Sequence, residues 1–478
     1  MLLCAIFVSA QATPQLAPEV RKYISIDAPT FALTHVRVID GTGAAAREDQ
    51  TILVSEGKIQ RIGDASTVQP SQGTKVIEKR GYTVIPGLVG MHNHMFYTAS
   101  LNRDDKGGQP EPGFFINEIP FTAPHLYLGC GVTSMRTTGS LEPYTDANVK
   151  KDIDTGRMPG PKMYITAPYF EGIGGGMIFP QMHELTDPAD ARRMVDFWTG
   201  QGFTSIKIYM HITHDELAAT VDEAHKKNIK VTGHLCSVGF REAAELGIDD
   251  LEHGLLVDTE FTPNKQRDTC PPVRDSYAAL AKLDVQGPEI QQTIRTLIDR
   301  KVAVTSTLPV FEAGVPMRPP LQQRVLDAMS PESRISYLTA RGRIAADSPF
   351  TALFKKEMQF ELAFSKAGGL LLAGPDPTGN GGTLPGFGDQ REVELLVEAG
   401  FTPLEAIKIA TLNGAQFMGQ QDHIGSIAEG KQADLVLING NPAANIADME
   451  KVETVFKDGI GYDSSKLIDS VRGQVGIR

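Results

Sequence analysis

The chain has 478 residues, enough for one large domain and a smaller one, and 41% of them are hydrophobic, as in ordinary globular proteins. Its 46 basic and 58 acidic side chains give a formal net charge of −12, which argues against a nucleic acid or an anionic membrane surface as a partner. No stretch of the sequence approaches the roughly 20 apolar residues that are needed to cross a bilayer.

The N-terminus resembles a short export signal. Residues 2–8 form an apolar run, and Ala10-Gln11-Ala12 resembles an A-x-A cleavage site, although a basic segment before the run is missing. We predict a signal peptide over residues 1–12 and a periplasmic or secreted protein, with a cytoplasmic protein as the alternative. The cysteines are too few and too scattered for a disulfide framework, so we expect no essential disulfide set and interpret Cys236 as a small buried residue rather than a nucleophile.

Segments at both chain ends have the character of short β-strands. Alternating apolar residues and turn-forming glycines mark three of them near the N-terminus, at 31–41, 50–63 and 74–85. Two similar segments lie near the C-terminus, at 433–440 and 452–462. Neither set can bury a core alone, so we predict one small β-sandwich domain that is assembled from residues 13–85 and 420–478.

Residues 86–419 alternate between strand-like and helix-like segments, which favours a parallel α/β architecture within the size range of a (β/α)8 TIM-type barrel. Helix starts are indicated by Asp187-Pro188, by a capping box at Thr213 and Glu216, and by Thr402. We expect Met194, Phe197 and Trp198 to form the apolar face of the first of these helices. The strands are expected at 204–210, 230–235, 247–254, 302–310 and 369–376, with a helical insertion between the last two.

The barrel region begins with the motif PGLVGMHNH at residues 86–94. In a β-strand the side chains of residues i and i+2 point to the same side, so His92 and His94 can converge on one point. Imidazole is the commonest protein ligand of divalent transition metals. Two histidines alone could equally be ordinary polar residues at a strand end.

Four further polar residues stand in or just after predicted strands. Lys207 lies between two isoleucines, and His234, His253 and Asp376 lie at or near the C-terminal ends of their strands. In a barrel these ends form the active-site face. Four histidines, one lysine and one aspartate at five strand ends predict a metal site.

The order of these residues resembles the amidohydrolase superfamily of metal-dependent hydrolases. The β-domain built from both termini, PGLVGMHNH and GSIAEGKQADLVLI at 425–438 are also similar to that family. The resemblance covers the chain after the leader. It is strongest to the prolidase-like and imidazolonepropionase-like group, which includes Xaa-Pro dipeptidases and hydrolases of N-acyl amino acids and amides.

The resemblance implies a binuclear site for two divalent metal ions, with zinc expected. His92, His94 and Asp376 would hold one ion, and His234 and His253 the other. Lys207 would carry a carboxylated amine (N6-carboxylysine) that bridges both ions. A buried ammonium near two cations has its pKa driven down, and the neutral amine can take up carbon dioxide; a lysine that is merely salt-bridged at the barrel mouth is the alternative.

The reaction that this site implies is hydrolysis of an amide or peptide C–N bond, in a small-molecule substrate such as an Xaa-Pro dipeptide, an N-acyl amino acid or a related amide. Two ions would lower the pKa of a shared water and polarise the substrate carbonyl. Asp376 would be the catalytic proton shuttle from the attacking hydroxide to the leaving nitrogen. Whether the chain forms a homo-oligomer is left open.

Two departures from the family pattern bear on specificity. Gly90 stands where the family usually has an acidic residue, so a carboxylate that supports the metal ligands is missing there. The loop at 169–183 is rich in glycine where dipeptidase relatives tend to place a histidine. Candidates for substrate binding are Tyr209, His183, Tyr169 and Arg136.

Three other functions are kept as alternatives on the same fold. A mononuclear deaminase or cyclic-amidine hydrolase is disfavoured, because such relatives usually lack the lysine found here as Lys207, and because HLCS at 234–237 offers no glutamate after His234. A lactonase remains open, because the same metal centre attacks ester carbonyls. A non-enzymatic scaffold is disfavoured, because such relatives typically lose metal ligands that are all present here.

Overall fold

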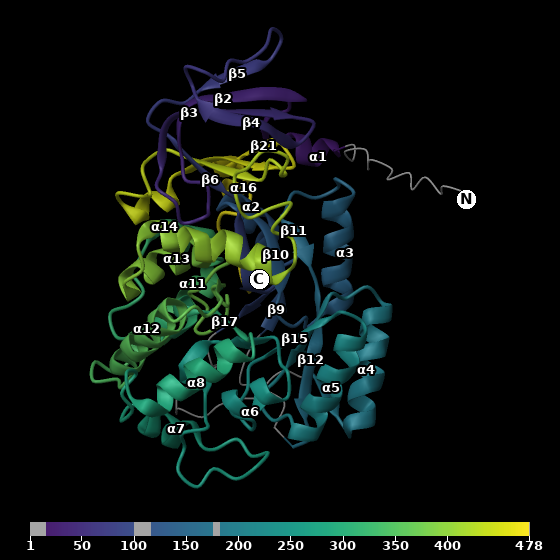
Figure 1. Cartoon of the computed structure of the whole chain (residues 1–478), viewed down its shortest axis with the longest axis vertical. Helices are drawn as coiled ribbons and strands as arrows, with labels where there is room; N and C mark the ends of the chain where they lie inside the picture. The colour runs from purple at the N-terminus through teal and green to yellow at the C-terminus, as the bar shows by residue number, and fades with distance from the viewer. Residues whose placement is uncertain (1–15, 100–115, 175–181, 478) are drawn as a thin grey trace.

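Nine strands from both ends of the chain form one sheet. The computed structural model describes residues 16–99, 116–174 and 182–477, so the predicted signal peptide at 1–12 lies outside the described residues. The N-terminal strands (purple) and the C-terminal strands (yellow) lie together at one end of the molecule in Figure 1. The strand order is β1-β21-β20-β19-β6-β2-β3-β4, with β5 beside β2. The nine strands are β1 (Ile24–Ile26), β2 (Thr30–Val38), β3 (Arg47–Ser55), β4 (Lys58–Asp64), β5 (Lys75–Glu78), β6 (Thr83–Pro86), β19 (Leu435–Ile438), β20 (Val452–Lys457) and β21 (Ile460–Asp463).

Two antiparallel ladders join the two chain ends: Leu435 of β19 faces Pro86 of β6, and Ile24 of β1 faces Tyr462 of β21. Buried side chains from both ends, such as Phe31 and Phe456, stack beneath the sheet with ring centroids 5.0 Å apart. The predicted assembly of a β-domain from both termini is therefore confirmed, as a sandwich-like sheet. Its boundaries, at 13–85 and 420–478, stay predictions.

The metal-site region contains two parallel sheets. One has the order β13-β12-β14-β15-β16-β17-β18 and the other has the order β11-β10-β7. A separate two-stranded antiparallel sheet pairs β8 with β9. The bounds are β7 (Leu88–Asn93), β8 (Phe96–Thr98), β9 (Ile116–Glu118), β10 (Val132–Thr137), β11 (Lys162–Tyr164), β12 (Thr166–Gly172), β13 (His183–Leu185), β14 (Ser205–Ile208), β15 (Lys230–Gly233), β16 (Asp250–Glu252), β17 (Ala303–Ser306) and β18 (Leu371–Ala373).

The predicted closed barrel is borne out only as a mixed α/β fold. The two parallel sheets meet at one extended segment, because only Ile165 separates β11 from β12. At the other end no ladder joins β18 to β7 in the described structure; a single backbone hydrogen bond of 3.0 Å runs from the Asp376 N–H to the His92 carbonyl. Predicted strand 302–310 ends early, because helix α9 begins at Leu308.

Helices alternate with the parallel strands and cover them from outside (Figure 1). They are α1 (Pro18–Arg21), α2 (Thr122–Gly129), α3 (Pro143–Asp154), α4 (Pro188–Gly200), α5 (His214–Lys226), α6 (Phe240–Glu245), α7 (Val273–Leu280), α8 (Pro288–Asp299), α9 (Leu308–Glu312), α10 (Gln323–Ala328), α11 (Pro331–Gly342), α12 (Phe350–Lys366), α13 (Phe387–Ala399), α14 (Pro403–Lys408), α15 (Gly414–Phe417) and α16 (Ser464–Asp469). Short 3-10 or π turns occupy Gly254–Val257, Ile409–Asn413 and Ile446–Glu450. The predicted insertion before β18 comprises α9 to α12.

The predicted helix starts are confirmed at α4, α5 and α14. Asp187 accepts a hydrogen bond from the Asp190 N–H, and both Thr213 and Thr402 form the expected capping boxes. The predicted apolar face of α4 was wrong in one residue. Phe197 is 45% exposed, because Ala191, Val195 and Trp198 already supply the buried side of the helix.

The expectation of no disulfide is corrected by the structure, which bonds Cys236 to Cys270 across 34 residues. Cys236 is therefore neither a free thiol nor a nucleophile. Pairing over such a distance leaves no local signal in the sequence.

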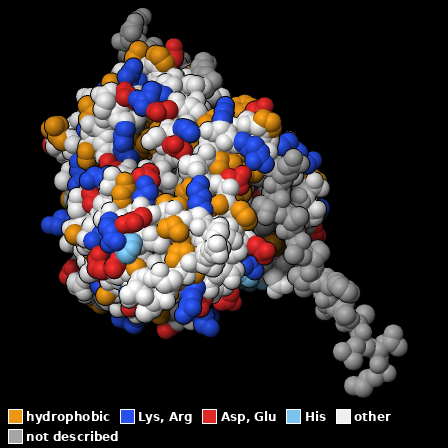
Figure 2. All heavy atoms as spheres, turned by 90° about the horizontal axis from the view of Figure 1, so that it is seen from above, with side chains coloured by type: hydrophobic (Ala, Val, Ile, Leu, Met, Phe, Trp, Pro, Cys, Tyr) orange, Lys and Arg blue, Asp and Glu red, His pale blue; other side chains and the backbone are white. Residues whose placement is uncertain are grey.

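No helix within the described ranges is both long enough and apolar enough to span a membrane. On the face shown in Figure 2, acidic and basic side chains are interspersed.

Candidate metal centre

His92, His94 and Asp376 converge where β7 and β18 end. His92 is the second-last residue of β7, and Asp376 lies three residues after the end of β18. The Oδ1 atom of Asp376 lies 3.3 Å from His94 Nε2 and 3.8 Å from His92 Nε2. One ligand atom from each residue lies within 4.8 Å of the other two, and all three side chains are buried. This group could hold a metal ion.

The orientation of His92 is set by a carboxylate that sequence reasoning missed. Glu252, fully buried at the end of β16, accepts a hydrogen bond of 2.6 Å from His92 Nδ1. This bond places the ring proton on Nδ1 and leaves the Nε2 lone pair facing Asp376. Glu252 also accepts from Arg136 Nη2 at 2.8 Å and from the Thr232 hydroxyl. The alternation of Asp250 and Glu252 in a strand just before His253 was the available signal.

Glu252 also bears on the departure at Gly90. A Cβ at position 90 would lie only 2.3 Å from the Asn93 side-chain amide, so this strand has no room for a side chain there. The Asn93 amide in turn donates to Asp389 of α13 at 3.0 Å. The carboxylate that supports His92 thus comes from β16 instead of from the histidine strand itself.

The protonation states suit metal ligation. Burial lowers the pKa of His92 well below its usual value, so its imidazole is neutral. Burial alone would raise the pKa of Asp376, but hydrogen bonds from His94 and Thr378 stabilise its ionised form, and the pKa is lowered. The Thr378 hydroxyl adds a hydrogen bond of 2.9 Å to Asp376 Oδ1. A neutral His92 imidazole beside the Asp376 carboxylate suits the donor set of a zinc-type site.

His234 and His253, which directly follow the adjacent strands β15 and β16, extend this group. The His253 ring centroid lies 4.6 Å from that of His92 and 4.3 Å from that of His234. His253 Nδ1 is 2.8 Å from the Thr307 hydroxyl. This hydrogen bond uses Nδ1 and not Nε2. Burial lowers the pKa of His253 well below its usual value and that of His234 to about 3. Both imidazoles are therefore neutral at physiological pH.

Two of the site residues have left-handed backbones. The φ angle is +72° at His253 and +46° at Asp376, a region that costs most residues free energy. His253 directly follows strand β16. The next residue, Gly254, has no room for a side chain, because a Cβ there would lie only 1.9 Å from the Glu357 carboxylate. Strained backbones of this kind are concentrated at functional sites.

Lys207 lies in β14 with its side chain 1% exposed. Its Nζ atom has no hydrogen-bond partner in the described structure, and its nearest carboxylate, Glu252 Oε1, is 3.9 Å away. Burial lowers the pKa of Lys207 to about 8, only partly offset by Glu252. The amine is therefore partly neutral near pH 8, which is the form that carboxylation requires.

A buried amine and a buried imidazole nitrogen without partners are costly unless another group binds them. Besides Lys207 Nζ, the Nδ1 atom of His94 has no hydrogen-bond partner within the described ranges. Both atoms belong to the constellation predicted from the sequence. The residues present therefore fit divalent metal ions.

Of the four predicted substrate-binding residues, the two tyrosines lie beside the candidate ligands. The Tyr209 ring centroid is 5.1 Å from that of His234, and the Tyr169 centroid is 6.4 Å from that of His94. The two tyrosine rings pack edge to face, with centroids 5.1 Å apart. They form one buried wall of the site.

The other two predicted substrate-binding residues are bonded to protein groups. Arg136 is 2% exposed and donates to the Met91 carbonyl, to Asp250 and to Glu252, and its contact with a substrate stays a prediction. His183 lies half-buried at β13, with Nε2 3.1 Å from Asp190 of α4. His211 is paired with Glu171, and His214 with Asp268.

Comparison with known proteins assigns the fold. The amidohydrolase family model matches residues 386–460. Over 91% of this chain and 100% of the other, the structure superposes on a Xaa-Pro dipeptidase with methionine bound in its active site, with a TM-score of 0.64 and 19% identity. The predicted resemblance to the amidohydrolase superfamily is thereby confirmed, and the chain has an amidohydrolase fold.

Two curated relatives match more closely in sequence but over short segments. A 5'-deoxyadenosine deaminase from Methanobrevibacter smithii is 41% identical over 79 residues, 16% of this chain and 18% of that protein. An imidazolonepropionase from Parabacteroides distasonis is 42% identical over 65 residues, 13% of this chain and 15% of that protein. The matched segments thus span less than a fifth of either relative.

Proposed function

We propose that the chain is a metal-dependent hydrolase that cleaves an amide or peptide C–N bond in a small molecule. The observation that carries this proposal is the buried group of His92, His94 and Asp376 at one end of the parallel strands. The fold likeness to a Xaa-Pro dipeptidase supports an Xaa-Pro dipeptide, an N-acyl amino acid or a related amide as substrate. We further propose that the parallel strands of residues 86–419 are arranged as in a (β/α)8 barrel, whose first and last strands, β7 and β18, are joined by no ladder in the described structure.

The proposed centre is binuclear, with zinc as the expected metal. His92, His94 and Asp376 would hold one ion, His234 and His253 the other, and a carboxylated Lys207 would bridge them. Ions bound there supply Lewis acidity and a water of lowered pKa. The unpartnered Lys207 Nζ and its lowered pKa support this assignment.

The chain's own residues then position and move the protons. Asp376 is ionised and can accept the proton of the attacking water, and it can pass that proton to the leaving nitrogen. Glu252 holds the tautomer and the orientation of His92. The buried wall of Tyr169 and Tyr209 excludes solvent from one side of the substrate.

A lactonase is the second candidate, because the same donor set would act on an ester carbonyl. A deaminase is favoured by one comparison, the 79-residue match, but Lys207 in the centre fits the binuclear hydrolase better. A screen of Xaa-Pro dipeptides, N-acyl amino acids, aryl amides and lactones with zinc-loaded protein separates these functions. We expect an amide to be cleaved; rapid lactone turnover without amide cleavage would overturn the proposal.

A role in catalysis for Asp376 is tested by Asp376→Asn. We expect this variant to bind metal and to lose most of its turnover, because an amide cannot take up the proton. The matched control is Asp389→Asn, which changes a buried carboxylate that bonds Asn93 and is outside the metal group. Full activity of Asp376→Asn, or equal losses in both variants, would contradict the assignment.

We also propose export to the periplasm or the medium. The bond between Cys236 and Cys270 supports it, because disulfides persist in oxidising compartments. The mass of the mature protein tests this proposal. Cleavage after Ala12 is expected, and mature protein that begins at Met1 would contradict it.

A further inference from the structure

The bond between Cys236 and Cys270 closes a covalent ring beside one half of the candidate metal centre. His253 lies within this ring of residues 236–270, and His234 stands two residues before it. The three residues of the other proposed ion site, at positions 92, 94 and 376, lie outside the ring. The bond therefore constrains the chain next to the residues that are proposed to hold the second ion.

Residues 258–272, which we call the tethered loop, connect the turn Gly254–Val257 to the start of α7. This described stretch contains neither a helix nor a strand. Within its second part, 263–272, only the Lys265 N–H donates to a backbone carbonyl, that of Thr262. The exposed residues of this part are Pro263, Asn264, Gln266, Arg267, Thr269 and Pro272. A segment with so few internal hydrogen bonds depends on its links to neighbouring segments.

Three polar or covalent links in the described structure join this part of the loop to its neighbours. The Lys265 ammonium donates to the Ser237 carbonyl. Asp268 accepts from the His214 N–H at 2.8 Å and lies 2.5 Å from His214 Nδ1. The third link is the disulfide. Because Lys265 and Asp268 are both partly exposed, their links are weak beside a covalent bond.

The residues after His234 are held from two sides. On the side of β14, Ser237 donates from its N–H to the Met210 carbonyl at 2.8 Å and from its hydroxyl to the Ile212 carbonyl at 2.5 Å. On the other side, all donors come from the tethered loop. The Cys236 carbonyl accepts from the Thr259 hydroxyl, and the Ser237 carbonyl accepts from Lys265. Release of the loop therefore removes the support on one side of this turn.

We propose that the bond between Cys236 and Cys270 is a redox-sensitive tether, whose reduction frees the tethered loop and weakens metal binding by His234 and His253 but not at the other ion site. Two molecules of a low-molecular-weight thiol supply the two electrons and two protons, form one disulfide between themselves and leave both cysteines as thiols. Cys270 is partly exposed and offers the sulfur for this attack. The inference rests on the proposed function for the second ion.

Release of the loop is measured by limited digestion with proteinase K, with the cleavage sites mapped by mass spectrometry. The full-length protein is compared in its oxidised form, after reduction and removal of the reductant, and after reoxidation. We expect cleavage within 263–272 to be at least tenfold faster after reduction and to return to its first rate on reoxidation. Equal rates in the oxidised and reduced forms would overturn the proposal.

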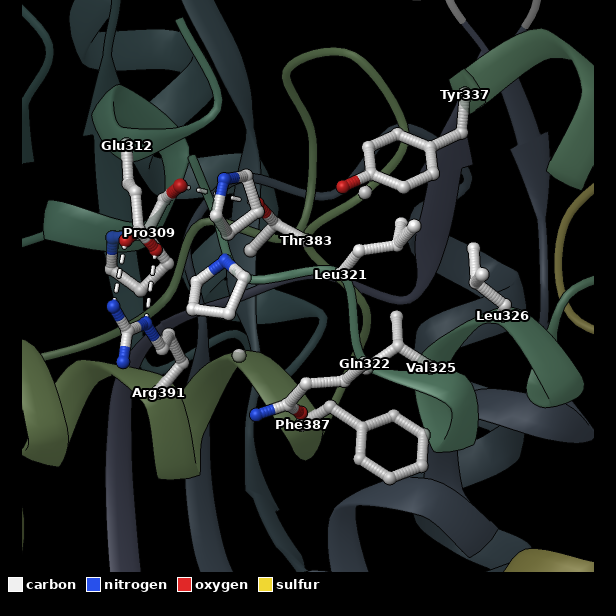
Figure 3. A pocket seen from close by; sticks show the side chains of 14 residues that line it. Pro309, Glu312, Leu321, Gln322, Val325, Leu326, Tyr337, Thr383, Phe387 and Arg391 are labelled. Atoms are coloured by element: carbon white, nitrogen blue, oxygen red, sulfur yellow. Dashed lines mark hydrogen bonds and ion pairs between the residues drawn. The ribbon is translucent and has the colours of Figure 1, made fainter. Parts of the chain in front are cut away.

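The matched control is the loop at 313–322, between α9 and α10, which contains no cysteine. Its Leu321 is 56% exposed and lies in the wall of the pocket in Figure 3. Its Arg318 is paired with Glu312 and Glu398, so ion pairs hold this loop in place of a disulfide. We expect its cleavage rate to change less than twofold on reduction. Equal acceleration in both loops would indicate general loosening of the fold and would overturn the proposal.

Zinc binding is then measured by competition with a chromophoric chelator. The variants are Cys270→Ser and the double variant Cys236→Ser/Cys270→Ser, which also removes the free Cys236 thiol as a possible ligand. Cys130→Ala, which removes the buried free cysteine, is the control. We expect one of two ions to bind about tenfold more weakly in both tether variants. We expect native binding in the control.

The outcomes separate this inference from the proposed function. Native affinity for both ions in the tether variants, or equal weakening of both ions, would overturn the inference and leave the proposed function standing. An oxidised native chain that binds no zinc would overturn both. The reduced native chain gives the same readout if a variant fails to fold.

Discussion

Replacing Glu252 by Gln separates the positioning of a metal ligand from the general stability of the fold. In the native chain this carboxylate accepts from His92 Nδ1 at 2.6 Å and from Arg136 at 2.8 Å. A glutamine oxygen is a weaker, uncharged acceptor, and its amide brings two hydrogens into a place built for an acceptor. The His92 ring then loses its fixed tautomer and orientation.

The size of this effect follows from two of the partners of Glu252, namely His92 and Arg136. Loss of a carboxylate that orients a metal-bound histidine costs about 10–100-fold in metal affinity, or about 1.4–2.7 kcal/mol. Breaking a buried ion pair costs up to about 3–5 kcal/mol of folding free energy. Asp250 still faces the Arg136 guanidinium at 2.7 Å, so we expect the stability loss at the low end of this range.

Asp250→Asn is the matched control, because Asp250 pairs with Arg136 but makes no hydrogen bond to His92 in the described structure. Zinc affinity is measured by competition with a chromophoric chelator, and stability by urea unfolding of the metal-free proteins. We expect both variants to be destabilised and only Glu252→Gln to lose zinc affinity. Native zinc affinity in Glu252→Gln, or an equal loss in Asp250→Asn, would refute the role given to Glu252.

Three further outcomes are expected. Lys207→Met should lower bound metal from two ions to one or fewer per chain and turnover by about 100-fold or more, because the bridging group is lost; unchanged metal content in elemental analysis would contradict this role. Cys236→Ser should lower the unfolding free energy by about 3–4 kcal/mol in urea titrations, because a 34-residue separation is then left unlinked; a variant as stable as the oxidised native chain would contradict the bond. Burial, together with Asp146, raises the pKa of Glu118 to about 9, so the folded chain holds a proton that the unfolded chain releases above about pH 4.5. Stability should therefore fall as the pH rises from about 5 to about 9, and Glu118→Gln should flatten this slope by about 1 kcal/mol or more in thermal unfolding; an identical slope in both proteins would contradict the shift.

The parts of the structure that the sequence predicted are those with a local signal. His92 and His94 share a face because strand side chains alternate, and Asp187, Thr213 and Thr402 begin helices through contacts within three residues. The strand-end positions of the other candidate ligands follow from the same reasoning.

The parts that could not be predicted depend on pairs far apart in the chain. Glu252 reaches His92 across 160 residues, and no spacing rule connects a strand-end glutamate to a particular histidine. The buried bonds of Arg136 to Asp250 and Glu252 likewise join residues 114 and 116 positions apart. The Cys236–Cys270 bond and the exposure of Phe197 likewise depend on how distant elements pack.

The central claim, a binuclear metal-dependent hydrolase, is tested most directly by titrating metal-free protein with zinc while bound metal and amide hydrolysis are followed together. The proposed centre predicts negligible hydrolysis without metal and a rate that rises until two ions are bound per chain. Full hydrolysis in the metal-free protein, or less than one ion bound per chain at saturation, would contradict the claim.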